Sequence, residues 1–328
     1  SNGFTMPSNA FESGETFIYI AIRRPMKPPA AGTGALDIQL QTTNLQDGTA
    51  LPTTPFLTDA VFSSWRDDGY SAFNIVRLTG GKSLVTHATS GESNSSFFDF
   101  GNFVTNTIKC TGNYDSSSAA RVHYSFKRIP GFFDMVCYTG TNGAISRTHN
   151  LTIAPELMIV KRRDNTGAWT VLSELGGSSY SEMALNSTIE KSTRNYSANQ
   201  YLTAQPTATV FAQHAAYNNN SGHTHIAFLF GTLEGISKVG VIAHSGTTNV
   251  ACGFEGGARF VLAKRTDAAG AWYVWDSVRN IIAGNDPYIV LNAIETEVTN
   301  TDYIDPLTGG FTFSDNFTDG TYLFLAIA

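Results

Sequence analysis

Apolar and polar residues alternate over short stretches along this chain, and no stretch keeps a helical period. The clearest segments are 259–264, 271–276 and 321–327, which are rich in β-branched and aromatic residues. Gly, Asn and Asp separate them, as in the turn at 266–270. About seven short strands with turns between them fit into residues 236–328, a spacing typical of a β-sandwich or barrel. We therefore predict an all-β chain.

The pattern of residues 157–171 returns in residues 260–274, and the offset is 264 − 161 = 103 residues. The residues that recur at this offset form four pairs: Lys161 and Lys264, Asp164 and Asp267, Gly167 and Gly270, Trp169 and Trp272. An offset this long indicates tandem copies of a whole domain rather than the short units of a solenoid. We predict tandem antiparallel β-sandwich repeats of about 100 residues, with jelly-roll or concanavalin-like topology. Two consecutive repeats forming one larger jelly roll would show the same period.

These repeats divide the chain into a first, diverged repeat at 35–131, a second at 132–235 and a third at 236–328. Residues 14–22 resemble residues 320–327, so residues 1–24 are predicted to be the end of a preceding repeat. Residues 25–34 are rich in Pro and Gly and are predicted to be a linker. We expect the chain to be the C-terminal part of a longer polypeptide.

Charged residues make up only 15 % of the chain and the net charge is −6. Nucleic-acid binding requires clustered Lys and Arg, so this composition argues against it. Three dispersed cysteines without a Cys-x-x-Cys pair indicate free thiols in a reducing cytoplasm. No run of 18 apolar residues and no signal peptide is visible, so we predict no membrane insertion.

The sequence contains no nucleophile elbow, P-loop, dinucleotide fingerprint or His-Glu-x-x-His motif. His223 and His225 share one face of a predicted strand, but no third metal ligand lies at a suitable spacing. Glu295 and Glu297 form an acidic doublet that borders a polar loop and does not recur at the offset of 103, so we expect both at the solvated surface. We therefore predict no catalytic residue, no cofactor and no metal site.

The residues that do recur have mainly structural interpretations. Trp169 and Trp272 follow a turn and are expected to have a packing role. The alternative is that these two rings and Tyr138 provide faces on which a sugar stacks. Lys161 and Lys264 lie between apolar neighbours, so we expect them to extend toward solvent or to pair with the nearby aspartates.

Two further kinds of recurring residue are assigned to turns. Gly167 and Gly270 lie in the predicted hairpin loops, and Asn186 and Asn292 are expected to cap turns through their side chains.

The order of motifs in the second repeat resembles a repeat domain of tailed-bacteriophage virion proteins. The motifs are Phe-Asp-Met-Val-Cys-Tyr-Thr-Gly at 133–140, Met-Ile-Val-Lys-Arg at 158–162, Gly-Ala-Trp-Thr-Val at 167–171 and Leu-Asn at 185–186. The resemblance covers most of 1–31 and 128–328, and the first repeat more weakly. It implies tandem concanavalin-like β-sandwiches in tail, fibre or other surface-exposed virion proteins.

On this resemblance we expect a structural virion component, as a tail fibre or another surface-exposed adhesion or receptor-binding protein. Its sandwiches are expected to stack end to end and to project from a particle assembled in the bacterial cytoplasm. The expected partners are other copies in a homotrimer or another homo-oligomer, other virion proteins and a host surface glycan. The alternatives are a carbohydrate-binding, lectin-like module, a capsid decoration or head-fibre protein and, less favoured, a polysaccharide depolymerase.

Overall fold

The computed structural model describes residues 28–328 except 43–44, 68, 70–71, 94–97, 101–106, 113–119, 199 and 214–218. The predicted end of a preceding repeat, at 1–24, lies outside the described residues. The described chain is built from β-strands and two single turns of 3-10 helix, which confirms the all-β prediction. Within this part of the chain, no helix has the length and apolar character needed to cross a bilayer.

The elements fall into three groups along the chain. The linker segment and the first repeat contain η1 (Gly32–Gly34), β1 (Leu36–Gln41), β2 (Ala60–Trp65), β3 (Phe73–Val76), η2 (Arg77–Thr79), β4 (Ser83–Val85), β5 (Phe98–Asp99), β6 (Lys109–Cys110) and β7 (Arg121–Phe126). The second contains β8 (Phe133–Thr139), β9 (Ile145–Thr148), β10 (Leu157–Arg162), β11 (Trp169–Ser173), β12 (Ser179–Ala184), β13 (Ser192–Asn195), β14 (Leu202–Ala204), β15 (Val210–Gln213) and β16 (Thr224–Phe230). The third contains β17 (Ser237–His244), β18 (Thr248–Ala251), β19 (Phe260–Arg265), β20 (Trp272–Asp276), β21 (Ile289–Val290), β22 (Ile304–Leu307), β23 (Gly310–Phe313) and β24 (Gly320–Ile327).

Each repeat forms one large antiparallel sheet with the same strand order. The orders are β1-β7-β2-β3-β4, β8-β16-β10-β11-β12-β13 and β17-β24-β19-β20-β21. In every case the first strand lies at the edge, the closing strand lies beside it, and the central hairpin follows. Among the described residues, no large sheet takes strands from two repeats.

A smaller sheet covers one face of each large sheet. These sheets are β14-β15-β9 in the second repeat, β18-β23-β22 in the third, and β5-β6 with a bridge from Ala50 to Lys109 in the first. A separate apolar cluster fills the sandwich in each of the three repeats. The chain therefore consists of antiparallel β-sandwiches.

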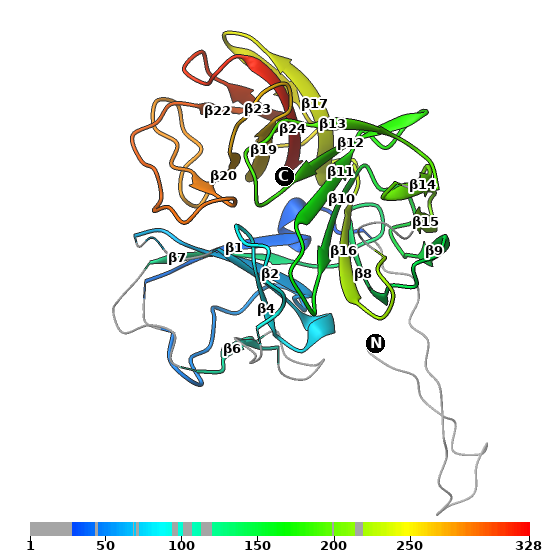
Figure 1. The fold of residues 1–328 in the computed structure, drawn as a ribbon. Helices are drawn as coiled ribbons and strands as arrows, with labels where there is room; N and C mark the ends of the chain where they lie inside the picture. The colour runs from blue at the N-terminus through cyan, green and yellow to red at the C-terminus, as the bar shows by residue number, and fades with distance from the viewer. Residues whose placement is uncertain are drawn as a thin grey trace, which may run out of the picture.

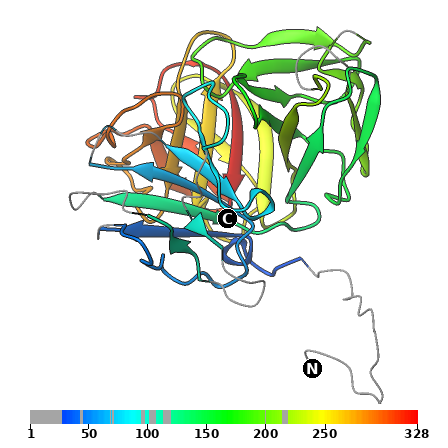
Figure 2. The same cartoon turned by 60° about the horizontal axis from the view of Figure 1, so that its bottom comes forward.

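The other faces of the three large sheets pack against one another. The largest apolar cluster takes residues from all three repeats, including Phe126, Phe230 and Ile327 at the ends of the closing strands. The rings of Phe126 and Phe230 meet edge to face, with 6.1 Å between their centroids. Figure 1 shows the blue-to-cyan, green and yellow-to-red segments arranged around this common centre, and Figure 2 shows it from a second direction.

Burial on both faces explains the sequence of the closing strands. Residues 322–327 of β24 are all buried, and they read as a continuous apolar run instead of an alternation. The expectation of separate sandwiches stacked end to end is wrong for this structure, because the three large sheets share one core.

Three equivalent backbone hydrogen bonds join the repeats into a closed ring. In each, an amide after the central hairpin of one repeat donates to a carbonyl at the hairpin loop of the next. The bonds are Glu92 N to Arg163 O (2.6 Å), Lys191 N to Thr266 O (3.0 Å) and Glu297 N to Arg66 O (2.8 Å). The last one links the third repeat back to the first, so the ring has no free end.

Candidate functional site

The two recurring tryptophans lie at the contacts between repeats. Trp169 is fully buried and its Nε1 donates to Val85 O of the first repeat at 2.8 Å. Trp272 is 1 % exposed and its Nε1 donates to Ala184 O of the second repeat at 2.9 Å. Each indole therefore anchors its own repeat to the preceding one. Neither ring offers a face on which a sugar would stack.

Tyr138 is the third residue considered for sugar stacking, and it is only 8 % exposed. Its hydroxyl accepts a hydrogen bond from Gln213 Nε2 at 2.8 Å, and its ring stacks on His225 with 5.2 Å between centroids. The guanidinium of Arg147 lies 4.6 Å from the centroid of the tyrosine ring. These contacts occupy the ring, so the structure leaves the carbohydrate-binding alternative without its predicted aromatic platform.

The recurring lysines are also buried between repeats. Lys161 Nζ donates to Gly167 O at 2.9 Å and across the contact to Thr89 O at 3.0 Å. Lys264 Nζ donates in the same way to Thr188 O of the second repeat at 3.2 Å. Burial lowers the pKa of each ammonium to about 8. Each lysine therefore binds carbonyl oxygens at a repeat contact.

The expected pairing of these lysines with the recurring aspartates is wrong. Asp164 instead accepts a hydrogen bond from Arg162 Nε at 3.2 Å, and Asp267 accepts one from Arg265 Nε at 2.8 Å. Both lysine side chains lie buried at the contact with the neighbouring repeat, where Lys161 Nζ also donates to Gly167 O of its own hairpin loop. The local ion pair was expected because the aspartates are close in sequence, whereas the sequence does not show which neighbouring repeat lies next to the lysines.

The recurring glycines and asparagines complete the same contacts. Gly167 N donates to Thr89 O and Gly270 N donates to Thr188 O, both at 2.8 Å. A Cβ added to Gly270 would lie 2.9 Å from the Cβ of Arg265, a distance that requires a shift of the hairpin.

The two asparagines hold the starts of the strands that carry the indoles. Asn186 Oδ1 accepts from the backbone N of Trp169 at 2.9 Å, and Asn292 Oδ1 accepts from that of Trp272 at 2.7 Å.

The contact that closes the ring, from the third repeat to the first, uses different residues. Ser64 takes the place of the recurring lysine as the fifth residue of β2, and Ala72 takes the place of the tryptophan. Thr86 N donates to Ala72 O just as Leu185 N donates to Trp169 O, which identifies the equivalent position.

At this contact an Arg–Glu ion pair, Arg66 with Glu297, matches the pair of Arg163 with Glu92 between the second and first repeats, and buried Arg279 extends it into a charge network. Glu297 receives Arg66 Nη2 at 2.8 Å on one oxygen and Arg279 Nη1 at 3.1 Å on the other. Arg279 Nε also donates to Asp276 Oδ2 at 2.5 Å, and the Tyr124 hydroxyl of the first repeat donates to the same oxygen at 2.8 Å. Sequence reasoning treated Glu297 as a solvated surface residue, because its partners lie far away along the chain.

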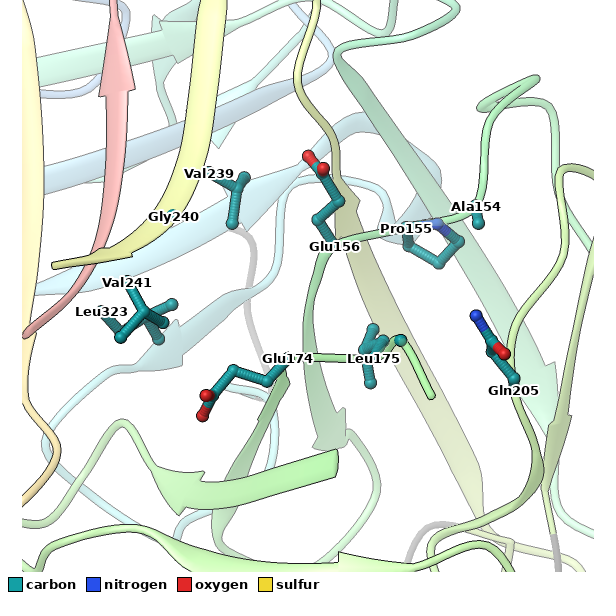
Figure 3. A pocket seen from close by; sticks show the side chains of 11 residues that line it. Ala154, Pro155, Glu156, Glu174, Leu175, Gln205, Val239, Gly240, Val241 and Leu323 are labelled. Carbon is teal, nitrogen blue, oxygen red and sulfur yellow. The ribbon is translucent and has the colours of Figure 1, made fainter. Parts of the chain in front are cut away.

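A pocket of about 500 Å3 lies between the second and third repeats. Its titratable lining residues are Glu156 and Glu174 (Figure 3). Glu156 Oε2 accepts from Thr232 N at 2.6 Å, and Glu174 Oε2 accepts from Lys191 Nζ at 2.7 Å.

These two carboxylates lack the features of a glycosidase pair. Desolvation acts to raise the pKa of Glu174, but hydrogen bonds from Lys191 and Ser181 hold it below its usual value. A general acid requires a raised pKa. Figure 3 shows the Glu156 and Glu174 carboxylates pointing away from each other. The arrangement does not resemble the facing carboxylates of glycoside hydrolysis.

The two histidines at the start of β16, His223 just before the strand and His225 within it, have separate environments. His223 Nδ1 contacts Asp164 at 3.1 Å and accepts from Arg162 Nη2 at 2.6 Å. His225 is fully buried, and burial lowers its pKa to about 4. Over the described ranges, no group of three or more His, Cys, Asp or Glu side chains is placed to hold a metal ion.

Comparison with known proteins identifies a family without assigning an activity. No curated protein and no solved structure matches the sequence. Residues 130–328, which span the second and third repeats and more than half of the chain, match the model of a domain of unknown function, DUF7483. The chain therefore belongs to the DUF7483 family.

Proposed function

We propose that this chain is a structural component of a tailed-phage virion, as a tail fibre or another surface-exposed adhesion protein. The supporting observation is that the recurring residues bind the neighbouring repeat. Trp272 and Lys264 both bind carbonyl groups of the preceding repeat, and Trp169 and Lys161 do the same one repeat earlier. The repeated sequence thus encodes a frame, and the motif resemblance to phage virion proteins suggests where such a frame is used.

A closed ring of sandwiches suits this role because it fixes the surface loops of the three repeats relative to one another. Loops held at fixed positions bind a repetitive surface with several weak contacts that add together. In this proposal the chain assembles with other copies of itself and with other virion proteins, and a host surface glycan is the receptor.

Antibody labelling of phage particles tests the proposal. Antibodies raised against the purified chain should decorate intact virions at one defined location, seen by negative-stain electron microscopy. Preincubation of the antibodies with the purified chain is the control, and it should remove the label. Absence of the chain from purified virions, judged by labelling and by mass spectrometry of the virion proteins, would contradict the proposal.

A second measurement separates an adhesion role from a decoration role. Purified chain added to host cells before the phage should slow phage adsorption if the chain binds the receptor. Labelled virions whose adsorption is unaffected would assign the chain to decoration of the particle instead.

A further inference from the structure

Three tyrosines of the third repeat form a cluster at the margin of its sandwich. The ring of Tyr288 contacts the other two: its centroid lies 5.1 Å from that of Tyr273, edge to face, and 5.8 Å from that of Tyr303, in a nearly parallel arrangement. All three are half-buried and pack against the apolar cluster inside the sandwich. Figure 1 shows the stretch from β20 to β22, in orange, as loops at the outer edge of the molecule. The cluster therefore combines ring packing inside the sandwich with a position at the surface.

The hydroxyls of these tyrosines have no hydrogen-bond partner in the described part of the chain. Other tyrosine hydroxyls do, such as that of Tyr196, which donates to Leu175 O at 2.7 Å. None of the three hydroxyls is among the buried polar atoms without a partner, so each reaches solvent. Desolvation raises the pKa of Tyr288 to about 12 and also raises that of Tyr273, so these hydroxyls stay protonated at neutral pH. They are free to donate to a ligand as well as to accept from it.

Backbone contacts hold the three tyrosines in place. Tyr273 lies in β20, between β19 and β21. Tyr288 exchanges two backbone hydrogen bonds with Val298, of 3.0 and 2.9 Å. Tyr303 N donates to the buried carboxylate of Asp286 at 2.9 Å. Side chains that are already fixed lose little conformational entropy when a ligand binds, so the cluster is preorganised for binding.

Two of the three tyrosines are absent from the equivalent positions of the other repeats. In the second repeat the strand pairing places Thr170 at the position of Tyr273 and Glu182 at that of Tyr288. In the first repeat these two positions hold buried residues, Phe73 and Ser83. The third tyrosine has a counterpart in the second repeat, Tyr201, just before β14. The complete cluster is therefore specific to the third repeat, and the recurring frame does not explain it.

The surroundings of the cluster are acidic. Glu295 is exposed and lies close enough to influence the pKa of two of the tyrosines, whereas no Lys or Arg of the described chain does so. Asp286, which binds the backbone of the third tyrosine, is itself influenced by the carboxylates of Asp302 and Asp305. Like charges repel, so these surroundings disfavour an anionic ligand and favour a neutral or cationic one.

We propose that the cluster of Tyr273, Tyr288 and Tyr303 is the binding site for a neutral glycan. This inference rests on the proposed function, in which a host surface glycan is the receptor, and it places the glycan on the third repeat. A sugar presents apolar C–H groups and many hydroxyls, and the cluster offers aromatic rings and free hydroxyls to match them. Glu295 adds an acceptor for further sugar hydroxyls. A basic peptide, the other ligand that an acidic surface admits, would depend on the carboxylate rather than on the phenol hydroxyls.

Binding to host polysaccharide, measured by biolayer interferometry on the full chain, tests this assignment. The probe is surface polysaccharide extracted from host cells and separated by anion exchange into a neutral and an acidic fraction. The wild type should bind the neutral fraction. The combined variant Tyr273→Phe, Tyr288→Phe and Tyr303→Phe should bind it at least about tenfold more weakly, because three hydrogen-bonding hydroxyls are lost. Its melting temperature should equal that of the wild type, because these hydroxyls bind nothing within the described chain.

Tyr196→Phe is the matched control, since it removes a hydroxyl that donates to Leu175 O: it should lower the melting temperature and leave binding unchanged. Equal binding by the wild type and the combined variant would overturn the proposal, and so would binding confined to the acidic fraction. No binding to either fraction, the result expected for a peptide ligand, would overturn it as well. Virion labelling and slowed adsorption would persist if this site alone is wrong. Glycan binding by a chain that is absent from virions would contradict the proposed function and leave the site standing.

Discussion

The indole of Trp272 should be one of the largest single contributors to stability, because it joins two repeats. The side chain is 1 % exposed, and its Nε1 donates to Ala184 O at 2.9 Å. Trp272→Ala leaves a large cavity at the contact, which costs about 3–5 kcal/mol. Loss of the hydrogen bond adds about 1 kcal/mol. We expect the variant to lose about 4–6 kcal/mol of unfolding free energy in all.

Urea denaturation followed by far-ultraviolet circular dichroism measures this loss without depending on tryptophan fluorescence. Trp272→Phe keeps most of the ring contact but loses the Nε1 donor, so we expect an intermediate cost of about 2 kcal/mol. Val278→Ala is the surface control, because this valine is 39 % exposed and the change should cost less than about 0.5 kcal/mol. A loss below about 1 kcal/mol for Trp272→Ala would refute the role assigned to the indole.

Three further predictions concern buried charges. Glu297→Gln should cost about 2 kcal/mol of unfolding free energy in urea, because Arg66 and Arg279 both lose their shared carboxylate. An unchanged unfolding free energy would show that the ring-closing contact does not contribute to stability. Burial lowers the pKa of His225 to about 4, so the unfolded chain binds more protons between that pH and about 6.5, and stability should fall as the pH falls through this range. His225→Phe should weaken that acid dependence in urea titrations at successive pH values, and an unchanged slope would contradict the assignment. Burial lowers the pKa of Lys264 to about 8, so the stability of the wild type should rise between pH 8 and about 10.5. Thermal unfolding at each pH should show a less steep rise in Lys264→Met. Identical slopes for the two proteins would count against a buried ammonium.

Local features of the fold were predictable from the sequence because they depend on nearby residues. Alternation and turn residues identified the hairpin formed by β19 and β20, in which Lys264 lies opposite Trp272. The offset of 103 residues marked the positions that now hold equivalent hydrogen bonds, such as those from the indoles of Trp169 and Trp272. A repeated residue in a repeated structure finds the same neighbours, so repetition alone indicated a structural role.

The arrangement of the repeats was not predictable, since it depends on contacts between distant segments. Glu297 binds Arg66 across 231 positions of the chain, and neither residue recurs at the offset that marks the other contacts. The first repeat carries Ser64 and Ala72 where the others carry Lys and Trp, so its sequence concealed the third contact. Apolar residues on both faces of the closing strands were the available signal for a shared core, because a lone sandwich needs only one buried face.

Differential scanning calorimetry tests most directly the claim that three sandwiches share one core. If the large sheets unfold together, the chain should show one transition whose calorimetric and van't Hoff enthalpies agree, with a ratio of about one. Three sandwiches that fold independently would give overlapping transitions and a ratio of about three. The shared core and the closed ring predict the first result, and the second would contradict them.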